Sequence, residues 1–298
     1  MSMAPAEFEG GFRPGRIDLP GGYTCERWPL SKLGPQEKIT ARVRVQSLLD
    51  ESMELVPSDT KDEVELAMKG GEVLFLRGLK TQEEPYEGLL AFRVFPIQLT
   101  SISERVRVMW FERFLSPQAQ DKHLGSSLIR VANFIAQPDA AAMRSQNIIG
   151  MRSMLSELRS EAKPNGLFDR VHPWRDGYKK YPYIRELVAG VIERTVDPDI
   201  LVRQTIDYKS AAIVNGVYPE GRSRSAPKDI IGKEANELWQ QLLDAGLDPD
   251  GGGAAYFIGK VAGKTNYLGD IQTSQPIAEN LVLPFEAQPF SSSSLGSL

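Results

Sequence analysis

The residue types that most often carry side-chain catalysis are scarce in this chain. Its 298 residues include one cysteine, Cys25, and two histidines, His123 and His172. An intrachain disulfide is therefore excluded, and a zinc site of Cys and His ligands would need nearly all three side chains to converge. Neither histidine lies in a nucleophile motif of the Ser-His or Cys-His type. The sequence thus favours a reaction that needs little side-chain chemistry, or a protein that binds without catalysis.

One carboxylate has an unusual setting. Glu112 lies between Trp110 and Phe114 on what alternation predicts to be the apolar face of a strand. A carboxylate among aromatic side chains has its pKa raised toward neutrality, which suits a general base. The competing interpretation is an ion pair at the strand end with an arginine such as Arg113 or Arg130. The sequence leaves both interpretations open.

A second candidate is the start of a helix. Gly125, Ser126 and Ser127 follow a predicted strand and a short polar loop, and an apolar helical pattern begins with them. A helix N-terminus exposes unpaired N–H groups and the positive end of the helix dipole, so it binds phosphate oxygens. Such a start is also an ordinary helix cap. Taken alone, the motif leaves phosphate binding and simple capping open.

The segment around this helix start resembles a known motif. Residues 120–129, Gln-Asp-Lys-His-Leu-Gly-Ser-Ser-Leu-Ile, are similar to the acyl-CoA pyrophosphate loop of the GNAT superfamily of N-acyltransferases. That loop has Gln or Arg, two residues, Gly, one residue, and then Gly or Ala. Gln120 and Gly125 match this pattern. His123 stands where the first Gly is usual, and its side chain would there either crowd the phosphates or contact them as a donor.

The resemblance implies a site for an amine acceptor and for acetyl-CoA or another acyl-CoA. It implies direct attack of the amine on the thioester in a ternary complex, with no covalent enzyme intermediate. Glu112 would deprotonate the amine, and Tyr208, in Asp207-Tyr208-Lys209-Ser210, would protonate the departing thiolate. The residues implied to hold the co-substrate are Phe114, Leu115, Gln120, Asp121, Lys122, His123, Leu124, Gly125 and Ser126.

Hydrophobic periodicity predicts the elements that must position these residues. Three apolar runs joined by short polar links predict consecutive antiparallel strands over 72–79, 88–99 and 106–115, the second interrupted by Pro96. Further strands are expected over 23–30, 211–218 and 254–261. Helices are expected over 36–54, 60–69, 126–136, 148–161, 183–195, 198–210 and 233–245. The first helix is expected to place Ile39, Val43, Leu49 and Met53 roughly on one side.

Over residues 23–136 this order is the one that the GNAT resemblance implies. The expected fold is therefore α/β, a GNAT-like mixed, mostly antiparallel sheet flanked by helices, with an insertion after the helix of the CoA loop. We expect a flexible arm over 1–22, a GNAT-like acyltransferase domain over 23–270 with the insertion at about 138–181, and an extension over 271–298 that is disordered near its end.

Net charge and hydropathy limit the classes of partner that we expect for this protein. Lys and Arg number 35 and Asp and Glu number 39, a formal net charge of −4, which argues against binding nucleic acid through bulk positive charge. No apolar stretch approaches the roughly 18 residues of a membrane span, and the N-terminus lacks the apolar core of a secretory signal. We therefore expect a cytoplasmic protein with no membrane or metal partner, acting on a small-molecule or peptide amine. A homodimer is left open.

Two other functions remain alongside acyl transfer from acyl-CoA. An acyltransferase like the autoinducer synthases, which have a related fold, would take its acyl group from an acyl carrier protein and would need a basic docking surface. A GNAT-like protein without catalysis would instead bind a partner or ligand. The resemblance favours the acyl-CoA enzyme, and the sequence names neither the acceptor nor the length of the acyl chain.

Overall fold

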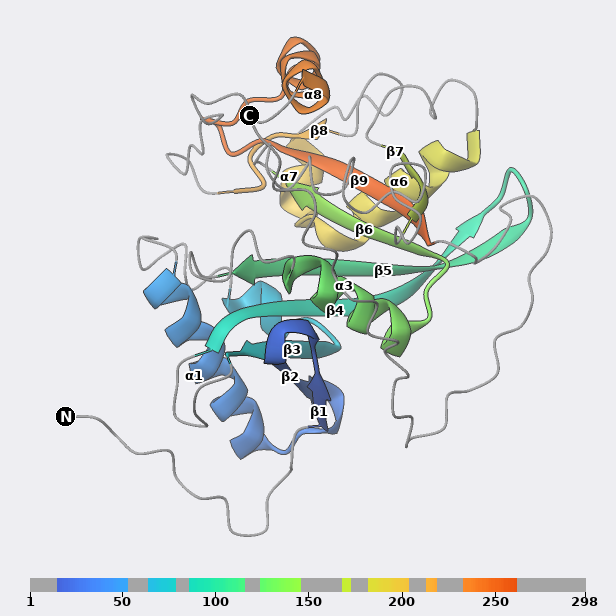
Figure 1. Cartoon of the computed structure of the whole chain (residues 1–298). Helices are drawn as coiled ribbons and strands as arrows, with labels where there is room; N and C mark the ends of the chain where they lie inside the picture. The colour runs from blue at the N-terminus through green and yellow to red at the C-terminus, as the bar shows by residue number, and fades with distance from the viewer. Residues whose placement is uncertain are drawn as a thin grey trace, which may run out of the picture.

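The computed structural model describes residues 15–52, 64–78, 86–115, 124–145, 168–172, 182–203, 213–218 and 233–261. Within these ranges the chain forms one sheet with the strand order β1-β2-β3-β4-β5-β6-β9-β7, and β8 also pairs with β9 (Figure 1). The strands are β1 (Gly15–Asp18), β2 (Thr24–Pro29), β3 (Glu72–Arg77), β4 (Tyr86–Leu99), β5 (Glu104–Leu115), β6 (Ala140–Ser145), β7 (Phe168–His172), β8 (Ile213–Val214) and β9 (Ala254–Val261).

The helices are α1 (Pro35–Ser52), α3 (Leu124–Ala136), α6 (Pro182–Thr195), α7 (Pro198–Arg203) and α8 (Lys233–Asp244), with short 3₁₀ turns η1 (Pro20–Gly22) and η2 (Leu30–Lys32). Residues 64–68 are also helical. None of the helices in the described ranges is both long and apolar enough to cross a membrane. The helix expected over 148–161 and the extension over 271–298 lie outside the described residues.

The three consecutive antiparallel strands predicted from the sequence are confirmed as β3, β4 and β5. Val73 pairs with Ala91, and Ala91 pairs in turn with Glu112. Pro96 does not interrupt β4. Beyond Phe92, β4 has no β3 residue opposite it, so a residue without an N–H is tolerated there as on an edge strand.

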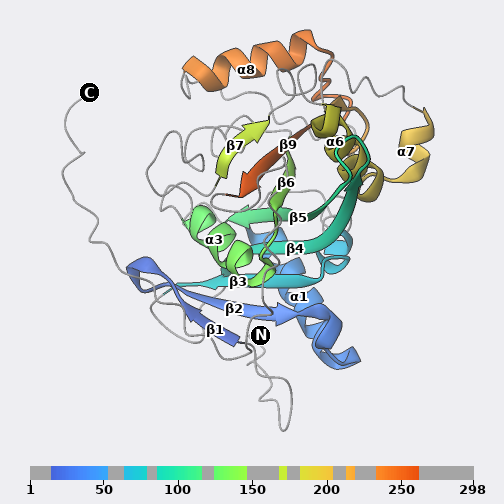
Figure 2. The ribbon, with the colours of Figure 1, turned by 90° about the vertical axis from the view of Figure 1, so that its right-hand side faces the viewer.

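Helices cover both faces of this sheet (Figure 2). On one face, α1 and residues 64–68 pack against alternate residues of β3 and β4, among them Phe75 and Leu89. On the other face, α3 packs against the intervening residues, including Leu74 and Leu90. The alternation of buried side chains along β3 and β4 therefore divides the interior into two apolar layers.

Helix α6 covers the far end of β4 on the same face as α1. A Cβ atom built at Gly190 would lie 2.8 Å from Cγ2 of Ile97, which is closer than real Cβ contacts allow. Ile97 shares a strand face with Ala91, whose side chain belongs to the layer under α1. Gly190 therefore lets the helix backbone approach the sheet closely at this point.

The exposed side of α1 differs from the prediction. The helix itself is confirmed, but Ile39 is 54% and Val43 is 58% exposed. The buried face consists of Ala41, Val45, Leu48 and Leu49. Of the residues predicted to share one side, Leu49 is buried, Ile39 and Val43 are exposed, and Met53 lies outside the described residues, while Ala41 joins the buried face.

Two domain expectations need correction. Residues 15–22, taken as part of a flexible arm, form β1 and η1, and β1 pairs antiparallel with β2. The region 138–181, taken as an insertion, contributes β6 to the centre of the sheet and β7 to its end. The strand expected over 211–218 is only the short β8. Strand β6 escaped prediction because it is rich in alanine and buried on both faces, so it shows no alternation.

The sheet divides between β5 and β6. The two strands pair in parallel only where residues 108–110 of β5 meet residues 140–142 of β6. Beyond that point β5 continues to Leu115 beside β4, and β6 continues to Ser145 beside β9. Figure 1 shows the two arrows moving apart toward their C-terminal ends. Backbone groups that face the widening are no longer paired with each other across it.

Candidate functional site

Polar side chains gather where β5 and β6 separate. Glu112 lies two residues beyond Trp110, the last β5 residue that pairs with β6. Arg144 lies two residues beyond Ala142, the partner of Trp110, and it pairs with Tyr256 of β9. Since side chains alternate along strands, all of these positions face the same side of the sheet. The divergence of the strands therefore places a carboxylate, a guanidinium and a phenol on one side of the sheet.

Glu112 and Arg144 form an ion pair across the widening. Nε of Arg144 lies 3.5 Å from Oε1 of Glu112, and their side chains are only 7% and 11% exposed, respectively. A buried charge is strongly unfavourable without a partner, so the two side chains depend on each other. The ion-pair interpretation of Glu112 is thus confirmed, although this arginine comes from β6 and was not named from the sequence.

The ion pair also bears on Glu112 as a base. The sequence argument relied on aromatic neighbours alone, whereas the structure places a guanidinium beside the carboxylate. The guanidinium of Arg144 lies over the ring of Tyr218, 4.8 Å from the ring centroid. Arg144 is therefore held by a carboxylate and an aromatic face together.

Tyr256 is fully buried beside this pair. Burial raises the pKa of the Tyr256 phenol, and the nearby Arg144 opposes this only in part. The phenol is therefore protonated at neutral pH and acts as a hydrogen-bond donor. Its hydroxyl lies near Arg144 and Thr195, without a hydrogen bond of ordinary geometry to any residue in the described ranges.

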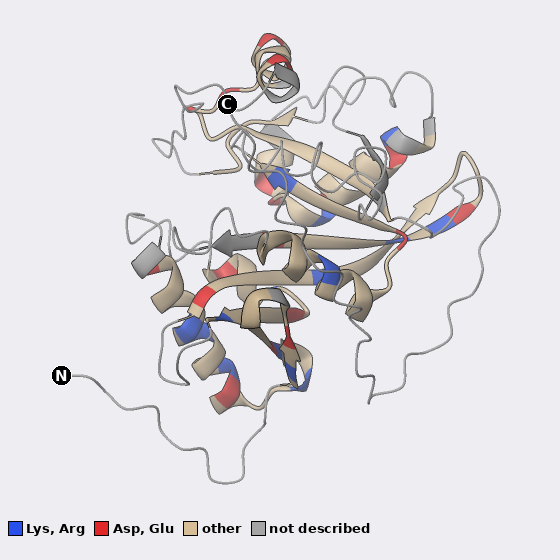
Figure 3. Ribbon diagram, viewed as in Figure 1, with Lys and Arg blue, Asp and Glu red and all other residues tan. Residues whose placement is uncertain are grey.

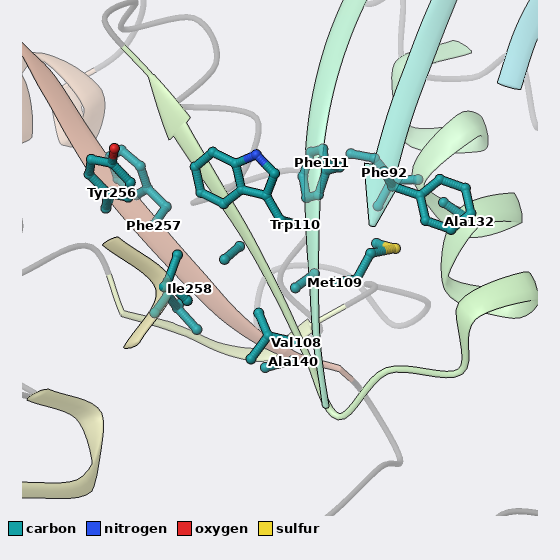
Figure 4. Packing of buried hydrophobic residues seen from close by; sticks show 14 of the residues in the cluster. Phe92, Val108, Met109, Trp110, Phe111, Ala132, Ala140, Tyr256, Phe257 and Ile258 are labelled. Carbon is teal, nitrogen blue, oxygen red and sulfur yellow. The ribbon is translucent and has the colours of Figure 1, made fainter. Parts of the chain in front are cut away.

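The indole of Trp110 lies next to the Tyr256 ring, with centroids 5.7 Å apart and planes tilted by 30°. Figure 4 shows the indole on the side of β5 toward Tyr256, with Met109 on the side toward Phe92 and Ala132 of α3. Nε1 of Trp110 is buried and, like the Tyr256 hydroxyl, has no hydrogen-bond partner among the residues that the structure describes.

A second arginine comes from the neighbouring strand β4. Arg93 pairs with Trp110 and donates a hydrogen bond from Nη2 to the carbonyl of Arg194, at 2.7 Å. Burial lowers the pKa of the Arg93 guanidinium, Glu112 opposes this, and Arg144 adds to it. The three charged groups are therefore close enough to influence one another. Figure 3 shows the charged residues of the sheet among long uncharged stretches of β4, β6 and β9.

The predicted co-substrate residues are only partly within the described ranges. Leu124, Gly125 and Ser126 form the first turn of α3, where N–H groups lack partners inside the helix. Phe114 and Leu115 end β5, but their side chains are not described. The rest of the predicted loop, Gln120, Asp121, Lys122 and His123, lies outside the described residues, as does the predicted acid Tyr208.

Sequence reasoning found Glu112 but missed its neighbours. Arg144 lies in a segment that was not predicted to be a strand, and Arg93, Trp110 and Tyr256 lie in apolar runs that look like ordinary core. A buried tyrosine or tryptophan in a strand is usually a packing residue, so their types gave no signal. Among the described residues, no three His, Cys, Asp or Glu side chains come together in a way that could hold a metal ion.

No protein-family model matches the sequence, and no curated protein matches it. Solved structures similar to the chain include one assigned to the GNAT family of acetyltransferases from Desulfovibrio desulfuricans, at 14% identity over 41% of this chain and 73% of that one, with a TM-score of 0.29. A Brucella melitensis GNAT family acetyltransferase in complex with acetyl-CoA is similar over 40% of this chain and 74% of that one, at 14% identity and a TM-score of 0.26. A GCN5-related N-acetyltransferase from Kribbella flavida is similar over 57% of this chain and 44% of that one, at 15% identity and a TM-score of 0.30.

These likenesses are partial and the scores are low, so the fold assignment rests on the strands and helices themselves. A strand, a helix, three antiparallel strands and a further helix follow one another as the sequence resemblance implied, and the parallel strand β6 comes next. The sheet is mixed and mostly antiparallel, with helices on both faces. The described part of the chain has a GNAT-like fold.

Proposed function

We propose that the protein is an N-acyltransferase that moves an acetyl or other acyl group from acyl-CoA to an amine by direct attack. The observation that carries the proposal is the position of Glu112. It lies on β5 just beyond the point where β5 leaves β6, and it forms a buried ion pair there with Arg144. A fixed carboxylate at the divergence of two parallel strands suits a base that must meet an acceptor between them.

The start of α3 supports a co-substrate with phosphate groups. Leu124, Gly125 and Ser126 are its first residues, so their N–H groups have no partner within the helix and would donate to an anion there. Gly125 has no side chain to obstruct an approach to these groups. Acyl-CoA would supply the activated thioester, while this chain would bind the pyrophosphate and orient the acceptor.

The proposed role of Glu112 is to accept a proton from the amine. Amines such as lysine have a pKa near 10, so at pH 7 the reactive neutral form is scarce without a base. General-base catalysis typically contributes about a hundredfold to ten-thousandfold in rate. Protonation of the departing thiolate stays assigned to Tyr208, as the resemblance implies.

The same ion pair favours one alternative. If Glu112 serves only to neutralise Arg144, the site can bind a ligand without catalysing a reaction. In that case Glu112→Gln would leave any turnover at the parental rate across pH 6–9. If Glu112 is the base, Glu112→Gln should lower turnover by about a hundredfold or more and should keep the affinity for CoA.

Calorimetric titration with CoA, acetyl-CoA and longer acyl-CoAs tests the proposal directly. Gly125→Glu adds bulk and negative charge at the start of α3, so it is expected to abolish binding. Gly125→Ala tests whether the position tolerates a side chain at all, with helix content followed by circular dichroism. Gln98→Glu is the matched control, because it adds the same charge at an exposed position of β4. Equal affinity of the parent and of a folded Gly125→Glu variant would place the site elsewhere.

A further inference from the structure

The site contains two buried hydrogen-bond donors that the proposed reaction does not use. Trp110 is 3% and Tyr256 is 1% exposed. Nε1 of the indole has no hydrogen-bond partner in the described part of the chain, and the phenol hydroxyl, although it lies near Arg144 and Thr195, makes no hydrogen bond of ordinary geometry there. Buried polar groups almost always have partners, so two orphaned donors in one place call for an acceptor. Figure 4 shows the two rings side by side between β5 and β9.

The charges around these donors select the kind of acceptor. Among the residues that the structure describes, two guanidinium groups, those of Arg93 and Arg144, interact with one carboxylate, that of Glu112. Within the described ranges, the hydrogen-bond acceptor of Arg93 is a neutral carbonyl, that of Arg194. Two donors in a surplus of positive charge favour an anionic oxygen over a neutral carbonyl.

We infer that Trp110 and Tyr256 bind a carboxylate of the acceptor, which assigns the acceptor to amines that carry a carboxylate, such as amino acids. This inference rests on the proposed N-acyltransferase function. A carboxylate accepts two hydrogen bonds at once, one from the indole and one from the phenol. Its negative charge balances the second arginine.

The position of Glu112 agrees with such a substrate. Glu112 follows Trp110 by two residues on the same strand face, a separation of about 7 Å along β5. In an amino acid the amine and the carboxylate are attached to one carbon. With the carboxylate at Trp110 and Tyr256, the amine of the same molecule lies on the side of Glu112. One set of strands thus fixes both ends of the acceptor relative to the base.

Matched pairs of ligands test the inference. Phenylalanine and phenethylamine, tyrosine and tyramine, and lysine and cadaverine differ within each pair only by a carboxylate. Each is titrated calorimetrically into the protein, with and without saturating CoA. At least one amino acid is expected to bind about tenfold or more tightly than its amine. Tyr256→Phe should lower the affinity for that amino acid by about 10- to 150-fold, because a hydrogen bond to a charged group is lost. The affinity for the corresponding amine should not change.

Tyr86→Phe is the control, because it removes the hydroxyl of another largely buried tyrosine, which bonds Glu26 outside the site. It should leave the preference for the carboxylate intact. Trp110→Phe should reduce the preference as Tyr256→Phe does. The melting temperature of Tyr256→Phe, followed by circular dichroism, should stay close to the parental value, because the removed hydroxyl makes no hydrogen bond of ordinary geometry in the described part of the chain.

Equal binding of every amino acid and its amine, or a preference that Tyr256→Phe retains, would overturn the carboxylate site. A Tyr256→Phe variant that loses stability but keeps the preference would show that the hydroxyl is structural. Failure of CoA and acyl-CoA to bind would refute the proposed function instead. The two failures are distinguishable because the amines are also titrated without CoA.

Discussion

The ion pair between Glu112 and Arg144 can be tested by removing each partner alone and both together. The side chains are 11% and 7% exposed, and 3.5 Å separates Nε from Oε1. At this burial, solvent screens the charges little, so removal of one partner leaves a buried charge that costs about 3–5 kcal/mol. We expect Arg144→Met to fall at the upper end of that range. Methionine has a similar volume, so the packing changes little.

The other single variant should cost less. In Glu112→Met the remaining guanidinium of Arg144 still has the ring of Tyr218 4.8 Å away, and this aromatic face compensates part of the loss. The double variant contains no buried charge at either position. Replacing a buried pair by apolar residues of similar volume is often neutral or stabilising, so most of the lost stability should return. The coupling energy of the cycle should therefore amount to several kcal/mol, well above the roughly 0.2–1 kcal/mol of an exposed pair.

Urea unfolding monitored by circular dichroism, at pH 5 and pH 8, measures this cycle. In Arg144→Met, Glu112 is a buried acid without its arginine, so the folded variant binds a proton more readily than the unfolded chain does. Its stability deficit therefore grows as the pH rises from 5 to 8. Single variants that each cost less than about 1 kcal/mol, or costs that simply add in the double variant, would refute the argument that the two side chains depend on each other.

Three further predictions concern the framework. Burial raises the pKa of the Cys25 thiol to about 12, so alkylation at pH 7.5 should require unfolding and should accelerate only as urea is added. Glu26→Gln should lower the free energy of unfolding by about 1.5–3 kcal/mol, because its carboxylate accepts a hydrogen bond from the Tyr86 hydroxyl at 2.7 Å and is flanked by two arginines; thermal denaturation measures this. Gly190→Ala should cost about 1–3 kcal/mol despite the better helix propensity of alanine, because its Cβ would meet Cγ2 of Ile97 at 2.8 Å, and the same substitution should cost less in an Ile97→Ala background, which lacks that atom.

The antiparallel part of the sheet could be predicted because its strands are simple to recognise. Strands β3, β4 and β5 are apolar runs with short polar connections, and their pairing follows from chain order. Strand β6 could not be predicted, because Ala140, Ala141 and Ala142 have low strand propensity and are buried on both faces. Without β6, no sequence pattern indicates that the central pairing changes from antiparallel to parallel.

Of the residues in the candidate site that the structure describes around β5 and β6, only Glu112 could be predicted from the sequence. Glu112 stands out because an acid interrupts an apolar strand face. Arg144 is 32 residues away along the chain, and Tyr256 is farther still. No local sequence pattern in either segment indicates a contact with Glu112. Their proximity depends on the register of β6 with β5 and of β9 with β6. A shift of one residue in either register would turn Arg144 or Tyr256 to the opposite face of the sheet.

The two interpretations of Glu112 that the sequence left open are compatible in the structure. A general base must lie in a fixed place beside the proton that it accepts, and the ion pair with Arg144 holds the Glu112 carboxylate in such a place. Its contribution to the proposed reaction must come chiefly from position, with the amine held against it by other groups. Effective catalysis then requires contacts that fix the acceptor, and the orphaned donors of Trp110 and Tyr256 are buried on the same side of the sheet to provide them.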